Sequence, residues 1–159
     1  MEIKKKIIVD LDVVTVGIWK KSDERKATAL RFMERVEYKE FEVVMLSSTL
    51  NLIEKWKNIE LSTSIRNFYS KNTNHFLDDL EIFDFLRKNN ASASAIIDDF
   101  LRKRIKQEDI MLILACVTVK ADYLITFNRK HLKNNAETIN TILNKYKLHR
   151  INVVHPNEI

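Results

Sequence analysis

Apolar residues fall into short runs that predict strands and helices in alternation. Residues 7–14 form a run rich in Val and Ile, which is typical of a buried strand in a parallel sheet. Residues 42–47, 123–127 and 150–154 are three further short runs that predict strands. Because helical patterns separate these runs, the alternation predicts a parallel sheet with helices on both faces.

Helical spacing of apolar residues fills the intervals between the predicted strands. One helix is predicted over residues 24–38, and a second starts at residue 48 and contains Glu54. Residues 61–106 are predicted to be helical throughout, and a last helix covers residues 136–146. The side chains expected to face the core from these helices are Leu30, Met33, Val36, Leu50, Ile53, Trp56, Phe76, Leu80, Phe83, Ile96, Ile97, Phe100, Leu101, Ile105, Ile139, Ile142 and Leu143.

The remaining helix is the most apolar stretch of the chain. Residues 110–121 are almost all apolar, which predicts a helix buried on every side. Glu108 and Asp109 stand at its start, and the strand over residues 123–127 follows its end. A polar tip ends that strand: Asn128, Arg129, Lys130 and His131. Because ligands bind beyond the carboxyl ends of strands in α/β sheets, this tip belongs to a candidate site.

Composition narrows the class of protein. The 159 residues are 45% hydrophobic and 31% charged, which suits one soluble globular domain over residues 1–159. The formal net charge of +5 favours an anionic partner. One Gly leaves no glycine-rich phosphate loop, and one Cys excludes a disulfide framework and fits a reducing compartment. Without a signal-peptide pattern or a run that could span a bilayer, we expect a cytoplasmic protein with no membrane partner.

Three carboxylates are candidates for a metal site. Asp10 lies in the first predicted strand run, Glu54 in the helix after the second strand, and Asp109 at the start of the buried helix. Asn128 adds a fourth oxygen donor after the next strand. Hard cations such as Mg²⁺ take oxygen ligands, and such a cation can activate water and stabilise charge on a phosphoryl group. The sequence therefore suggests phosphoryl chemistry.

Each of these residues also has a structural explanation. Asp10 could cap the turn after its strand, and Asp109 is favourable in a first helical turn whatever its function. Glu54 alone is typical of a solvated helix residue, and Asn128 alone of a turn. Asp12 stays open between a functional and a structural role. Spacing alone therefore does not establish the cluster.

Two pairs of basic residues flank the acidic positions. Lys103 and Arg104 precede the buried helix, and Arg129 and Lys130 follow the next strand. If the sheet brings the pairs together, a positive rim surrounds the acidic centre, which suits RNA. A solvated helix face is the alternative explanation. Four aromatic residues are interpreted as core or edge packing rather than as base-stacking platforms: Trp19, Trp56, Phe68 and Tyr69.

Several of these segments together resemble a PIN domain. Residues 121–132, ADYLITFNRKHL, follow an apolar helix that begins near Asp109, and they resemble the C-terminal half of that family. The similarity is closest to the small prokaryotic, often archaeal, stand-alone branch that includes VapC-type toxins. Ile8-Val9-Asp10 fits the first motif of the family, Ser47-Ser48 followed by Glu54 fits the second, and residues 153–158 fit the usual ending. The resemblance spans nearly the whole chain.

The resemblance implies a three-layer α/β/α, Rossmann-like, helix-rich fold and an endoribonuclease that uses Mg²⁺ or Mn²⁺. It carries Asp10, Glu54 and Asp109 over as metal-binding catalytic carboxylates, with Asn128 positioning a water. Many members have a carboxylate where Asn128 stands, which lowers the metal affinity expected here. The resemblance also implies a homodimer and, for a toxin, an antitoxin protein as partner.

Two other functions stay open at this point. A PIN fold with weak or no catalysis could bind RNA or form a protein complex, and Asn128 supports that alternative. A haloacid-dehalogenase-like phosphatase could use Asp10 as nucleophile and Asp12 as general acid. The phosphatase requires Asp98 and Asp99 to follow a strand, whereas the spacing of the neighbouring apolar residues predicts a helix there.

Overall fold

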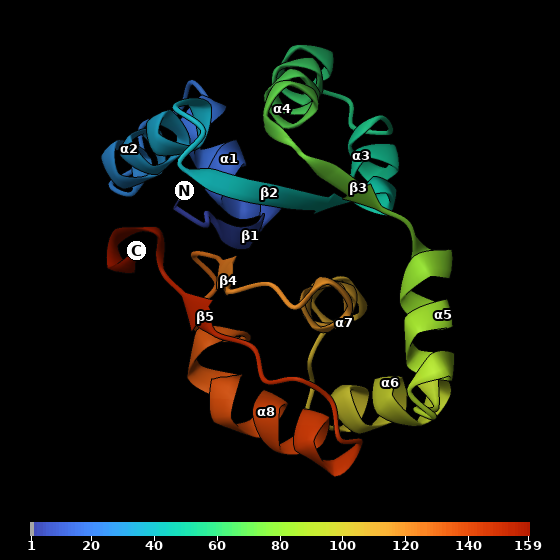
Figure 1. The fold of residues 1–159 in the computed structure, drawn as a ribbon. Coiled ribbons are helices and arrows are strands. Elements are labelled where there is room, and N and C mark those ends of the chain that lie inside the picture. The colour runs from blue at the N-terminus through green and yellow to red at the C-terminus, as the bar shows by residue number, and fades with distance from the viewer. Residues whose placement is uncertain (1) are drawn as a thin grey trace.

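A computed structural model describes residues 2–159 and, within them, one five-stranded sheet (Figure 1). The strands are β1 (Lys5–Val9), β2 (Phe41–Leu46), β3 (His75–Leu77), β4 (Tyr123–Ile125) and β5 (Val153–Val154). Neighbouring strands pair in parallel, in the order β3-β2-β1-β4-β5. Along the chain, β2 and β3 are added on one side of β1, and β4 and β5 are added on the other side. The strand order therefore reverses between β1 and β4.

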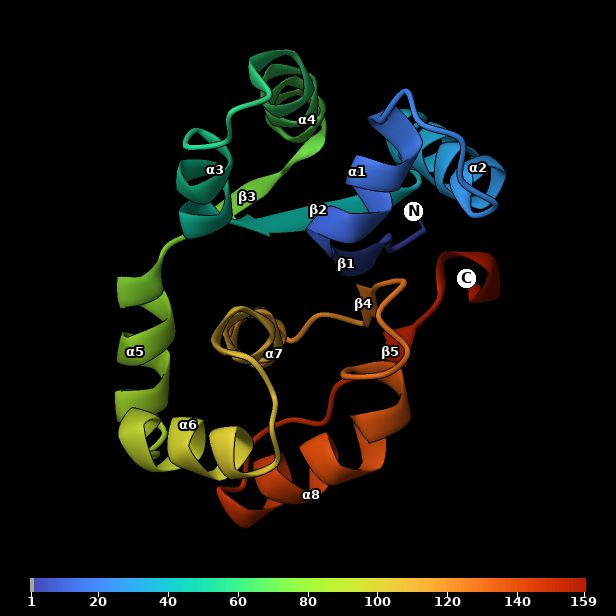
Figure 2. The same ribbon diagram turned by 180° about the vertical axis from the view of Figure 1, so that it is seen from behind.

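The central strands send alternate side chains to opposite faces of the sheet, as the period of a strand requires. Ile7 and Val9 of β1 belong to one core, and Ile8 belongs to the other. The first core is covered by α1 (Leu11–Ile18), α2 (Lys26–Glu37), α3 (Ser47–Ile53) and α4 (Ile59–Asn72). The second is covered by α5 (Asp79–Lys88), α6 (Ala93–Arg102), α7 (Gln107–Val119) and α8 (Ala136–Lys145). Figures 1 and 2 show the resulting three layers, which confirm the predicted fold class.

Helix α7 is the buried helix that the apolar run predicts. It packs against β1, α5 and α6, and its side chains from Ile110 to Val117 are buried apart from Met111. Burial raises the pKa of the Cys116 thiol above its usual range, so this cysteine behaves as a packing residue. The helix ends next to Lys120, which adopts a left-handed conformation, and β4 follows at once.

The first predicted strand is too long, because the chain turns into α1 directly after Asp10. The β-branched residues of α1 suit a strand by propensity, but Val13 and Val14 are buried in the core that α1 shares with α2 and α4. Tertiary packing therefore overrides local propensity. Gly17 allows α1 to lie close to α2, since a Cβ at this position would clash with Met33.

The interval over residues 61–106 is not helical throughout, because His75–Leu77 form the edge strand β3. The stripe predicted to be buried there is wrong: Phe76, Leu80 and Phe83 are 38%, 73% and 39% exposed. Helix α5 instead turns Ile82 and Leu86 towards the core.

The other residues predicted to face the core are in part exposed, in part half-buried and in most cases buried. Leu30 and Leu101 are exposed, and Leu50, Trp56 and Ile97 are half-buried. The positions that are buried as predicted are Met33, Val36, Ile53, Ile96, Phe100, Ile105, Ile139, Ile142 and Leu143. The helical periodicity therefore identifies most of the core correctly, and its errors fall on residues beside the buried face.

Helix α6 contains Asp98 and Asp99, as predicted, so the strand that the phosphatase alternative requires is not there. The Asp99 carboxylate accepts hydrogen bonds from the Tyr146 hydroxyl at 2.5 Å and the Lys145 ammonium at 2.9 Å. Asp99 therefore connects α6 to the end of α8, which is a structural role. Within residues 2–159, no helix is long and apolar enough to cross a membrane.

Candidate acidic site at the strand-order reversal

Asp10 lies immediately beyond the carboxyl end of β1. Its backbone N–H donates to the Ile125 carbonyl of β4 at 2.8 Å, and its carboxylate Oδ2 accepts from the Thr126 hydroxyl at 2.8 Å. These two bonds hold Asp10 between β1 and β4, where the strand order reverses. Ligands of open α/β sheets bind at this kind of position.

Thr126 is a site residue that the sequence interpretation missed. Its side chain is almost fully buried, and its Oγ1 both donates to Asp10 and accepts the backbone N–H of Asn128 at 2.9 Å. The signal in the sequence is a hydroxyl inside an otherwise apolar run. Such a residue is common in strands, so the signal does not distinguish a site from ordinary sheet packing.

Asp109 reaches the same region from the first turn of α7. Its carboxylate Oδ2 accepts from the Asn128 side-chain amide at 3.5 Å. The Asn128 amide oxygen, expected to be an oxygen donor for a cation, instead accepts the backbone N–H of His131 at 3.0 Å. Asn128 therefore closes the turn after β4 and orients Asp109.

Asp10 and Asp109 line one pocket with a volume of about 420 Å³. Its walls come from the end of β2, the starts of α1, α3, α5 and α7, and apolar side chains of α7. The other polar residues that line it are Ser48, Thr49, Asp79, Gln107 and Glu108. The pocket is thus acidic: four carboxylates line it, Asp10, Asp79, Glu108 and Asp109, and they come from distant parts of the chain.

The acidic groups of this region resist ionisation. Burial, reinforced by the charges of Asp12 and Asp109, raises the pKa of Asp10 to about 7, while the Thr126 hydrogen bond opposes the rise. Burial also raises the pKa of Asp12 to about 6 and that of Asp109 above its ordinary value, where His131 opposes the rise. Burial is the largest cause in all three cases, and the nearby positive charges do not offset it. A bound cation would add positive charge that favours the ionised carboxylates.

Asp12 lies in the first turn of α1 and faces the loop after β4. Its carboxylate accepts the backbone N–H of Phe127 at 3.2 Å and is 3.5 Å from the Thr126 hydroxyl. Asp12 does not line the pocket that Asp10 and Asp109 share. Asp12 therefore holds the loop that contains Asn128 in place through a hydrogen bond.

The structure does not place Glu54 with Asp10 and Asp109. Glu54 follows the last residue of α3, its side chain is 50% exposed, and it forms an ion pair of 3.0 Å with Arg66 of α4. The residues of α3 that do line the pocket are Ser48, Thr49 and Leu52. Because Glu54 comes only two positions after Leu52, it points to the opposite side of the helix.

The donor set fits a hard cation that keeps part of its hydration shell. Within residues 2–159, no three His, Cys, Asp or Glu side chains are grouped closely enough to hold a metal by themselves. Asp10 and Asp109 supply carboxylate oxygens only, without sulfur or imidazole. Mg²⁺ is commonly bound by one or two carboxylates together with waters and substrate phosphates. The site fits that arrangement and does not form a complete protein cage.

The four predicted RNA-binding residues, Lys103, Arg104, Arg129 and Lys130, are exposed. Lys103 follows α6 and lines a shallow pocket with Asn134 of the 3₁₀ turn η1 (Lys133–Asn135). The Asn134 N–H donates to the Arg129 carbonyl at 2.7 Å. Lys103 and the Arg129 backbone therefore lie beside η1, and none of the four residues lines the acidic pocket.

The comparisons with known proteins bear on the fold. No family model and no curated protein matches the chain. Among solved structures, it is similar to a chain in the crystal structure of VapBC2 from Rickettsia felis bound to a DNA fragment from their promoter. The sequences are 13% identical, the TM-score is 0.58, and the match covers 94% of this chain and 98% of that one. This near-complete similarity confirms the resemblance noted in the sequence: the chain has a VapC-like PIN-domain fold.

Proposed function

We propose that this protein is a PIN-type endoribonuclease that hydrolyses RNA phosphodiester bonds with Mg²⁺ or Mn²⁺. One observation carries the proposal: the half-buried Asp10 and the buried Asp109 share a pocket at the reversal of strand order. Burial raises the pKa of both carboxyl groups, which is common at functional sites. The VapC-like fold supports the same proposal.

Asp10 and Asp109 would hold the cation. When bound, it would stabilise charge on a phosphoryl oxygen and lower the pKa of a coordinated water. Thr126 fixes the Asp10 carboxylate, and Asn128 fixes the Asp109 carboxylate, so the protein prepares both groups before RNA arrives. The exposed basic residues would contact the RNA backbone: Lys103, Arg104, Arg129 and Lys130.

We further propose a toxin role with an antitoxin protein as partner. The similar structure is a VapBC2 complex bound to promoter DNA, and this fold likeness supports the proposal. A homodimer and a cytoplasmic location belong to the same proposal. Co-purification of this chain with the product of a neighbouring gene, together with loss of RNA cleavage in the complex, would support the toxin role.

The decisive experiment is cleavage of single-stranded RNA by the purified protein with Mn²⁺, Mg²⁺ or EDTA. We expect cleavage with either metal, none with EDTA, and a loss of at least about 100-fold in Asp10→Asn and Asp109→Asn, because the groups that hold the cation would be missing. A folded protein that cuts none of several RNAs would contradict the proposal.

Weak or absent catalysis is the second candidate function, and two observations favour it. Asn128 presents an uncharged amide to Asp109, and the described residues lack a group of three metal-binding side chains. A fold of this kind would bind RNA or a partner protein without cutting. RNA binding that persists in EDTA, in a protein without metal-dependent cleavage, would support this candidate.

A further inference from the structure

A second pocket adjoins the acidic one across the first turn of α1. It has a volume of about 500 Å³, within the range of small-ligand sites, and we call it the tryptophan pocket. Leu11 lines both pockets. The residues of the tryptophan pocket that matter below are Leu11, Asp12, Trp19, Lys21, Arg25 and Trp56.

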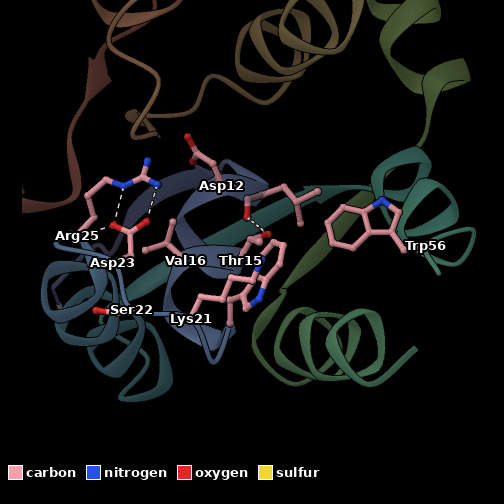
Figure 3. A pocket seen from close by; sticks show the side chains of 10 residues that line it. Asp12, Thr15, Val16, Lys21, Ser22, Asp23, Arg25 and Trp56 are labelled. Atoms are coloured by element: carbon pink, nitrogen blue, oxygen red, sulfur yellow. Dashed lines mark hydrogen bonds and ion pairs between the residues drawn. The ribbon is translucent and has the colours of Figure 1, made fainter. Parts of the chain in front are cut away.

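Both tryptophans of the chain line this pocket, although the sequence interpretation assigned them to core or edge packing. Trp19 directly follows α1 and is 38% exposed, and Trp56 follows α3 and is half-buried. Phe68 and Tyr69 are buried, as expected. Figure 3 shows the Trp56 side chain lying across the pocket from Arg25. The pocket therefore presents aromatic surface from two separate elements.

Two cations and two carboxylates line the tryptophan pocket: Lys21, Arg25, Asp12 and Asp23. The Lys21 ammonium lies 5.0 Å from the centre of the Trp19 ring, a distance typical of a cation–π contact. Within residues 2–159, Lys21 forms no ion pair with a carboxylate, whereas Arg25 is held by Asp23 in a bidentate pair with bonds of 3.0 and 2.8 Å. Aromatic surface beside an ammonium of this kind suits a flat base next to a phosphate.

Residues two positions apart in the chain line the two pockets. Asp10 lines the acidic pocket and Asp12 lines the tryptophan pocket. Two residues of chain span at most about 7 Å, which one nucleotide can bridge. A strand whose phosphodiester lies at Asp10 would therefore bring an adjacent base to the indoles.

We propose that the tryptophan pocket binds an unpaired nucleobase of the RNA strand whose phosphodiester bond lies at the acidic site. The base stacks against the Trp19 and Trp56 indoles, and Lys21 contacts the adjoining phosphate. The pocket thus selects single-stranded substrate, because a paired base cannot enter it. This inference rests on the proposed function in taking RNA as the ligand, and its test separates the two.

The two tryptophans make the pocket directly observable. The chain contains only these two tryptophans, and both line the pocket. Trp19 also lines a neighbouring pocket, so the intrinsic fluorescence of Trp56 is the signal that reports on the tryptophan pocket. We would titrate the wild-type protein in EDTA, where metal-dependent cleavage does not occur, with a short single-stranded RNA and with an abasic strand of equal length. The expected result is quenching by the RNA and little or none by the abasic strand.

Variants then test whether stacking contributes to affinity. Trp19→Ala and Trp56→Ala should each weaken binding of labelled RNA about tenfold, in line with the loss of one stacking contact, while Trp19→Phe keeps most of the affinity. Tyr38→Ala removes an aromatic side chain that is 73% exposed at the end of α2 and should bind as wild type. Thermal melts of each variant verify folding.

The outcomes separate the inference from the proposed function. Quenching and weakened binding in the tryptophan variants, in a protein that cuts no RNA, would support the base pocket and contradict the nuclease. Metal-dependent cleavage without quenching, with Trp19→Ala and Trp56→Ala binding like wild type, would overturn the base pocket and leave the nuclease standing. The apolar walls would then suit a segment of a partner protein.

Discussion

The Thr126 hydroxyl donates a hydrogen bond of 2.8 Å to the Asp10 carboxylate and so joins the end of β4 to the end of β1. The same oxygen accepts the backbone N–H of Asn128, whose side-chain amide contacts Asp109. A continuous chain of hydrogen bonds thus runs from Asp10 through Thr126 and Asn128 to Asp109. Each of the four residues depends on its neighbours for position.

Replacing Thr126 by Val tests this chain. Valine has nearly the same shape but leaves the Asp10 carboxylate and the Asn128 N–H without their partner, which costs about 1–3 kcal/mol of unfolding free energy. We expect metal-dependent RNA cleavage to fall about tenfold, since outer hydrogen-bond partners commonly affect metal sites by about 10–100-fold. Thr126→Ser keeps the hydroxyl and should stay near wild type. Equal rates in the Val and Ser variants would contradict the proposed role.

The raised pKa of Asp10 predicts a pH-dependent stability of the metal-free protein. Its pKa is about 7 in the folded state against an ordinary 3.8, so the folded state binds the extra proton between these values. The stability that protonated Asp10 contributes to the folded state is therefore fully present below about pH 4, and it is lost as the pH rises through about 7. Asp10→Asn removes this dependence.

Thermal melts in EDTA between about pH 4 and pH 8 check this prediction. Asp10→Asn should melt above wild type at the upper end, by about 3 °C or more, since 1 kcal/mol corresponds to about 2–4 °C in a domain of this size. The difference should shrink towards the lower end, where wild-type Asp10 is protonated in the folded state. A difference that does not change with pH would show that the Asp10 charge is not the cause.

Asn128→Asp should strengthen metal binding. The variant places a second carboxylate 3.5 Å from Asp109 Oδ2, so repulsion lowers stability without metal and attraction to a cation increases. We expect the Mn²⁺ concentration that half-stabilises the protein in thermal melts to fall about tenfold, an effect of about 1.4 kcal/mol. Asn134→Asp adds the same charge at an exposed position of η1. Equal shifts in both variants would mean that only net charge matters.

Glu54 should be dispensable for cleavage. Glu54→Gln removes the charge that pairs with Arg66 at 3.0 Å, and such an exposed pair is worth at most about 1 kcal/mol. Cleavage should stay within about twofold of wild type, since the lost stability is small, and Arg66→Ala should behave in the same way. If Glu54→Gln loses cleavage as Asp109→Asn does, then Glu54 must leave Arg66 and join the site when metal binds.

Local pattern was sufficient for the elements whose burial is extreme. The apolar run that becomes α7 and the short strand β4 after it are recognisable in the sequence because most of their consecutive residues are buried. Asp10 and Asp109 follow from the same logic, since each stands at the end of such an element. The parallel α/β class follows from the alternation of the two patterns.

The tertiary structure decided which polar groups meet. Whether Glu54 reaches the site depends on where α3 ends and on which face of α3 lies towards the acidic pocket. In the folded protein, Glu54 instead pairs with Arg66 of α4. Thr126 becomes important only because the pairing of β1 with β4 brings it to Asp10. Trp19 and Trp56 line one pocket although they follow different helices. Sequence spacing encodes the face of an element, but contacts between elements depend on register and packing, which no short window of sequence contains.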